Sequence, residues 1–82
     1  MKQQTLIELL NEMICRDFDI EETAEVLNDI NEYLIARREA NRLEEDEDYR
    51  EFWAESQYRR KKWMLEMLEK YSIELTLDEI EA

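Results

Sequence analysis

Apolar residues recur at steps of three and four along most of the chain, which is the spacing of one face of an α-helix. The first such stretch predicts a helix over about residues 6–17. A second helix is predicted over about residues 20–43 and a third over about residues 49–71. The apolar positions are Leu6, Leu9, Leu10, Met13 and Ile14 in the first helix, and Val26, Leu27, Ile30, Tyr33 and Leu34 in the second.

The third helix contains most of the aromatic residues of the chain, arranged along a heptad-like seam. We expect Phe52, Trp63 and Tyr71 to lie in the core. Trp53 and Tyr58 are instead expected at a partly exposed interface, because aromatic residues dominate binding hot spots. The seam consists of Tyr49, Trp53, Ser56, Arg60, Trp63 and Met67.

Arg60 is the charged member of this seam. A buried charge needs a counter-charge, for which Asp29 and Glu32 are candidates, or the side chain must extend to water. Tyr58 and Leu65 lie on the other side of the same helix and predict a second contact surface. The predicted partner or dimer interface therefore comprises Trp53, Tyr58, Arg60 and Leu65.

Five consecutive carboxylates separate the second helix from the third: Glu44, Glu45, Asp46, Glu47 and Asp48. Mutual repulsion disfavours a helix here, so the run predicts a turn with Asp48 as the cap of the next helix. One unbroken helix over about residues 20–71 remains the alternative, because the chain has no Gly and no Pro.

Helix starts are indicated by capping boxes, in which an oxygen-bearing side chain precedes a glutamate by three residues. After the third helix, residues 73–77 alternate like a short strand, with an extended connector as the alternative. A last turn of helix is expected from Thr76. The four candidate boxes are Thr5 with Glu8, Asp19 with Glu22, Asp48 with Glu51, and Thr76 with Glu79.

These elements predict an all-α fold in a single domain, residues 1–82. A short N-terminal helix packs on a long antiparallel helical hairpin, and residues 73–82 form a short C-terminal element. A chain of 82 residues builds only a thin core. We therefore expect a homodimer.

The composition excludes most catalytic chemistry. The chain has no His, which is the commonest general base and metal ligand, and no Gly for a phosphate-binding loop. Its single cysteine, Cys15, can form neither an internal disulfide nor a zinc site. We expect no enzymatic activity, no cofactor and no metal. The lone cysteine and the absence of an export signal indicate the cytoplasm, the host cytoplasm if the chain is phage-encoded.

The chain carries 23 acidic and 11 basic residues, for a net charge of −12. This charge opposes direct binding to nucleic acid or to an anionic membrane and favours a basic protein partner. The second predicted helix presents an acidic outer face opposite its apolar face. This face consists of Glu21, Glu25, Asp29 and Glu32, and the run from Glu44 to Asp48 continues it.

Residues 49–72 are the exception, with six basic and four acidic residues. Four of the cations are consecutive, from Arg59 to Lys62, so on a helix they point in four directions. We expect them to compensate carboxylates of the first two helices or of a second copy, rather than to bind nucleic acid.

Two functions remain. An acidic face can engage a basic surface, such as that of a nucleic-acid-binding protein or nuclease, whereas the ordinary alternative is a face that is only solvated. Phage inhibitors of restriction and CRISPR systems include small acidic helical proteins that imitate nucleic acid, and the chain is similar to them in size and charge, without a shared motif. Alternatively, the aromatic third helix serves a structural, assembly or chaperone-like role.

Overall fold

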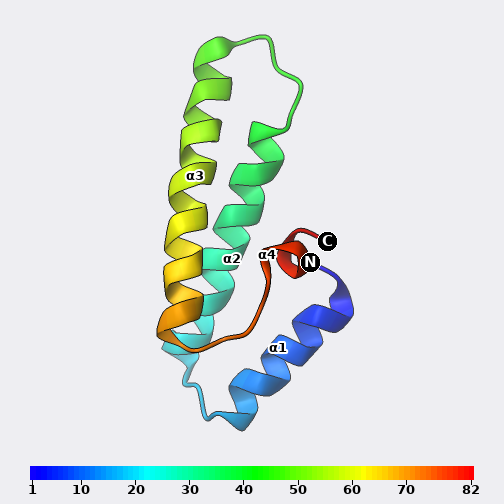
Figure 1. The fold of residues 1–82 in the computed structure, drawn as a ribbon, viewed down its shortest axis with the longest axis vertical. Coiled ribbons are helices and arrows are strands. Elements are labelled where there is room, and N and C mark those ends of the chain that lie inside the picture. Colours follow the sequence, from blue (N-terminus) through cyan, green and yellow to red (C-terminus); the bar gives the residue numbers. More distant parts are fainter.

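A computed structural model describes residues 1–82 and contains four helices and no strand. Helices α2 (Ile20–Ala40) and α3 (Glu47–Lys70) run antiparallel and form the long hairpin. Helix α1 (Gln3–Cys15) lies beside one half of the hairpin, together with the short α4 (Leu77–Glu81) (Figure 1). The predicted all-α architecture is confirmed.

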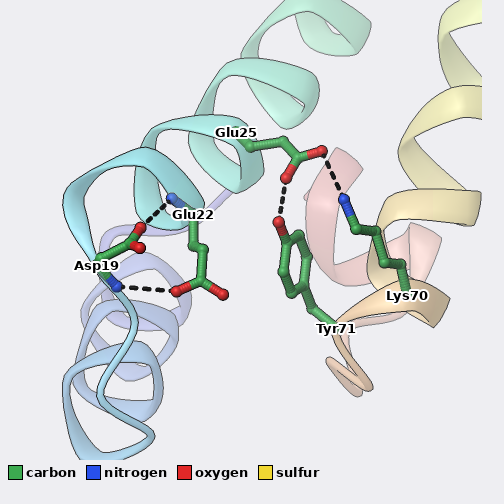
Figure 2. Close-up of polar contacts among 5 residues, drawn as sticks. All are labelled: Asp19, Glu22, Glu25, Lys70 and Tyr71. Carbon is green, nitrogen blue, oxygen red and sulfur yellow. Dashed lines mark hydrogen bonds and ion pairs between the residues drawn. The ribbon is translucent and has the colours of Figure 1, made fainter.

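Two of the predicted capping boxes are present. At the start of α2, the backbone N–H of Glu22 donates to Asp19 Oδ1 at 2.8 Å, and the Asp19 N–H donates back to Glu22 Oε1 at 3.1 Å (Figure 2). Thr76 and Glu79 form the same reciprocal pair at the start of α4. The box at Thr5 is wrong, because α1 already begins at Gln3.

The turn between α2 and α3 is confirmed, and the alternative of one unbroken helix is wrong. However, Asp46 caps α3 instead of Asp48: its carboxylate accepts from the backbone N–H groups of Asp48, at 3.0 Å, and Tyr49, at 3.3 Å. This earlier start places Glu47 and Asp48 in the first turn of α3. There the positive end of the helix dipole stabilises both carboxylates.

Helices α1 and α3 end in the same way, each in a Schellman motif built without glycine. Asp17, with φ 56°, and Ser72, with φ 52°, occupy the left-handed position after the helix. The next residue then bonds back: Ile73 N–H donates to the Leu68 carbonyl at 2.9 Å. Residues 73–76 continue as a connector, so of the two alternatives for residues 73–77 the extended connector is confirmed and the strand is wrong.

The core lies in the half of the hairpin that α1 and α4 cover. Ile80 of α4 is completely buried there. The Tyr33 hydroxyl donates to Glu81 Oε2 at 2.6 Å, and Arg37 pairs with the same oxygen at 2.9 Å, which fixes α4 to α2. The core consists of Leu9, Met13, Val26, Ile30, Tyr33, Met64, Met67, Leu68, Ile73 and Ile80.

Several aromatic and apolar positions differ from the prediction. Phe52 and Trp63 are not core residues, since they are 56% and 54% exposed, and Ile14 of α1 also faces solvent. The buried side of α3 is turned about the helix axis relative to the predicted seam. Met64 and Leu68 therefore face the core, and Trp63 lies at its edge. Ala36 of α2 and Ser56 of α3 are also buried, and side chains this small permit a close approach of two helices.

Replacing Ser72 by Gly should stabilise the protein by about 0.5–1 kcal/mol, because glycine adopts the left-handed conformation without a Cβ clash. Chemical denaturation measures the change in the free energy of unfolding. Ser72→Ala is the matched control and should give no gain, because alanine retains the Cβ. An equal gain from both substitutions would contradict this account of the α3 end.

Candidate partner-binding surfaces

Three glutamates of α2, spaced seven residues apart, lie against α3. Glu25 accepts hydrogen bonds from the Tyr71 hydroxyl and from Lys70 Nζ, the latter at 3.3 Å (Figure 2). The other two contacts join Glu32 to Arg60, with Oε2 and Nη1 3.2 Å apart, and Glu39 to the Tyr49 hydroxyl. A seven-residue spacing returns to the same side of a helix every two turns. We call Glu25, Glu32 and Glu39 the glutamate ladder.

The ladder changes the interpretation of the predicted acidic face. Glu25, Asp29 and Glu32 are half-buried beside α3 and do not form an outer face, whereas Glu21 is exposed. Of the two candidate partners of Arg60, the structure shows Glu32 and not Asp29. Cations of α3 draw two of these carboxylates towards that helix: Lys70 pairs with Glu25, and Arg60 pairs with Glu32. Glu39 was not among the predicted site residues, although its heptad spacing from Glu32 was a usable signal.

The ladder contacts stabilise the charged carboxylates. The hydrogen bond from Tyr71 holds the pKa of Glu25 below its ordinary value, against the opposing effect of burial, and Lys70 lowers it further. The hydrogen bond from Tyr49 lowers the pKa of Glu39 in the same way. These glutamates are therefore ionised at neutral pH and are already engaged within the chain.

Asp29 lies between two ladder glutamates, and no ion pair or hydrogen bond involves its side chain. Burial raises the pKa of Asp29, and the negative charges of Glu25 and Glu32 raise it further, with Lys70 acting in the opposite direction. The ionised form of Asp29 is thus less favourable in the folded protein than in the unfolded chain.

A second acidic surface lies at the far end of the hairpin, beyond α1 and α4 (Figure 1). No side chain of this surface forms an ion pair within the chain. The only cation in the same stretch is Arg50. We call this surface the acidic tip; it consists of Glu44, Glu45, Asp46, Glu47, Asp48 and Glu51.

The acidic tip and Glu21 do not form one continuous ribbon. Glu21 is in the first turn of α2, and the tip follows the last turn of that helix. Twenty-one residues of α-helix span about 30 Å. The predicted acidic site is therefore divided into a solvent-facing residue at one end, an internal ladder, and a tip at the other end.

The predicted interface residues on α3 also lie on different sides. Trp53 is half-buried and packs edge-on against Phe52, with ring centroids 5.1 Å apart. Arg60 turns to α2 and its ladder partner. Tyr58 and Leu65 are exposed on the outer side of α3. These four residues do not form a single contact surface.

No group of three or more acidic, cysteine or histidine side chains is arranged to hold a metal ion. Cys15 is a free and exposed thiol. None of the helices combines the length and the apolar character needed to cross a membrane. Comparison of the chain with protein-family models, curated proteins and solved structures finds no match.

Glu25→Gln should lower the midpoint of thermal unfolding at pH 7, because it removes the charge that accepts from Tyr71 and pairs with Lys70. A carboxyl group whose pKa is lowered by folding stabilises the fold at pH values above its ordinary pKa of 4.5. This stabilisation is lost as the pH falls through the lowered pKa. The loss should therefore be absent in strong acid. Combining Glu25→Gln with Tyr71→Phe should cost less than the sum of the single changes; strict additivity would contradict the ladder contact.

Asp29→Asn should have the opposite sign and raise the unfolding midpoint at pH 7. A raised pKa means that the protonated group favours the fold, and this contribution is lost as the pH rises through the raised pKa. The gain over wild type should thus be full at neutral pH and should vanish below 3.8, the ordinary pKa of aspartate. Unfolding curves across this pH range test it. A loss of stability at pH 7 would contradict the assignment.

Proposed function

We propose that the protein is a non-enzymatic binding module whose acidic tip engages a basic surface of a partner protein. One observation carries the proposal: the carboxylates of the tip have no cation partner within the chain, whereas Glu25, Glu32 and Glu39 pair with Lys70, Arg60 and Arg42 respectively. Like charges held close together repel, and a cation-rich surface relieves that repulsion. The tip is thus the acidic surface best suited to an external partner.

The shape of the hairpin supports the same proposal. The molecule measures 46 × 22 × 19 Å, and the tip lies at one end of the long axis. A narrow acidic end can enter a groove that a flat surface cannot. Phe52 and Trp53 directly follow Glu51 of the tip and add aromatic contact area, which carries much of the affinity in protein interfaces.

The chemistry of such a groove suggests the class of partner. Grooves lined with Lys and Arg are typical of proteins that bind nucleic-acid phosphates. We propose that the partner is a nucleic-acid-binding protein or nuclease, and that the module inhibits it in the cytoplasm, the host cytoplasm if the chain is phage-encoded. The net charge of −12 supports a protein partner in place of nucleic acid itself.

Assembly through α3 is the second candidate. Phe52 and Trp63 are large aromatic residues, more than half exposed on a helix that packs against α2 on another side. Binding through aromatic residues persists at high salt, whereas binding through the tip weakens as salt screens the charges.

Neutralising the tip should weaken partner capture by at least about tenfold. The immobilised protein is exposed to bacterial lysate at low and high salt, and duplex DNA is added as a competitor. We expect a basic protein that elutes with salt and is displaced by the DNA. The variant carries Glu44→Gln, Glu45→Gln, Glu47→Gln and Asp48→Asn, and retains Asp46 because it caps α3.

A matched control loses the same number of charges elsewhere. All four of its positions are exposed. Equal loss of capture with both variants would show that only net charge matters, and undiminished capture by the tip variant would overturn the proposal. The control carries Glu8→Gln, Glu12→Gln, Glu69→Gln and Glu74→Gln.

A further inference from the structure

We propose that two copies of the protein pair through one flank of α3, antiparallel, about a two-fold axis that passes between Lys62 and Trp63. This flank is distinct from the acidic tip, and the proposal does not depend on what the tip binds. It commits to a second copy of the chain as the occupant of a surface that nothing in the single chain covers.

Five exposed residues define the flank, which we call the Trp63 flank. Glu55, Arg59, Trp63, Glu66 and Lys70 follow one another at steps of four, four, three and four, so they share one side of the helix. Glu55, Arg59 and Glu66 form no ion pair within the chain. Trp63, at the centre, leaves 54% of its surface exposed.

The order of charges on this flank is self-complementary. Arg59 and Glu66 are equally far from the proposed axis, and Glu55 and Lys70 are equally far from it on either side. An antiparallel second copy therefore places each Arg59 level with a Glu66, and each Glu55 level with a Lys70. Two-fold symmetry forms every pair twice, which gives four opposite-charge pairs around two central tryptophans. A parallel copy would place Arg59 against Arg59.

Lys70 can take part although it already binds Glu25. Its side chain is 61% exposed, and an ammonium group has three donors, of which the contact with Glu25 uses one. At the centre, each Trp63 lies level with Lys62 of the second copy. A lysine ammonium over an indole ring is attracted by the ring quadrupole.

The charge distribution also explains why this helix, and no other, suits self-association. The net charge of −12 makes two copies repel over most of their surface. Helix α3 has six basic and six acidic residues, whereas each of the other three helices has more carboxylates than cations. Two copies can approach there without accumulating like charge. Burial of Trp63 then supplies an aromatic anchor at the centre of the contact.

Sedimentation equilibrium with charge-reversed variants tests the proposal. Wild type should dimerise, and either Arg59→Glu or Glu66→Arg should raise the dimer dissociation constant by at least about tenfold, because each reversal acts at two symmetric places. The double variant restores opposite charges in exchanged positions and should recover the wild-type constant to within about threefold. Both residues are exposed and unpaired, so circular dichroism should show unchanged helicity.

Arg50→Glu is the matched control, since it makes the same charge change on α3 outside the Trp63 flank. It should leave dimerisation unchanged. A wild-type protein that remains monomeric at high concentration overturns the proposal. So does a double variant that dimerises no better than the single ones, because that result would assign the loss to something other than the Arg59–Glu66 pairing.

Discussion

The hairpin depends on the neutralisation of α2 carboxylates by α3. A chain with 23 acidic residues cannot fold compactly unless some of them meet positive charge or hydrogen-bond donors. The glutamate ladder provides this at three levels along the hairpin, at Tyr71 with Lys70, at Arg60, and at Tyr49. Each later glutamate of α2 meets a partner that lies earlier in α3, so the three contacts together fit only an antiparallel register. The apolar core lies in the half that α1 and α4 cover, and the contact of Glu39 with Tyr49 continues the junction of α2 and α3 towards the other end.

This constraint divides the charged residues into two groups. Glu25, Glu32 and Glu39 hold the hairpin together and are already occupied. The acidic tip lies beyond the last level of the ladder, and Arg59, on the Trp63 flank of α3, forms no ion pair within the chain. Charges of opposite sign are therefore left available in separate places. A chain with such an arrangement can bind a basic partner at one surface and a copy of itself at another.

The features that the sequence predicted correctly are those that depend on residues close together in the chain. The boxes at Asp19 and Thr76 depend on side chains three residues apart, and both are present in the structure. Asp46 was missed as a cap because five adjacent carboxylates offer several equivalent starts. Trp63 was misplaced because a small rotation of α3 moves a seam residue to the edge. The outer face of α2 was misjudged because amphipathic patterning assumes one packed side, whereas α2 contacts α3 on a second, charged side.

The separation of the two proposed surfaces resolves a conflict between acidity and self-association. In the antiparallel pair, the start of each α3 lies about 15 residues from the axis, so the two acidic tips are about 45 Å apart at opposite ends. The Debye length at physiological ionic strength is about 8 Å, so the tips do not sense each other's charge. A parallel pair would bring the tips together and lose this advantage. Antiparallel pairing thus permits a high charge density at each tip, and it presents two such tips to partners on opposite sides of the dimer.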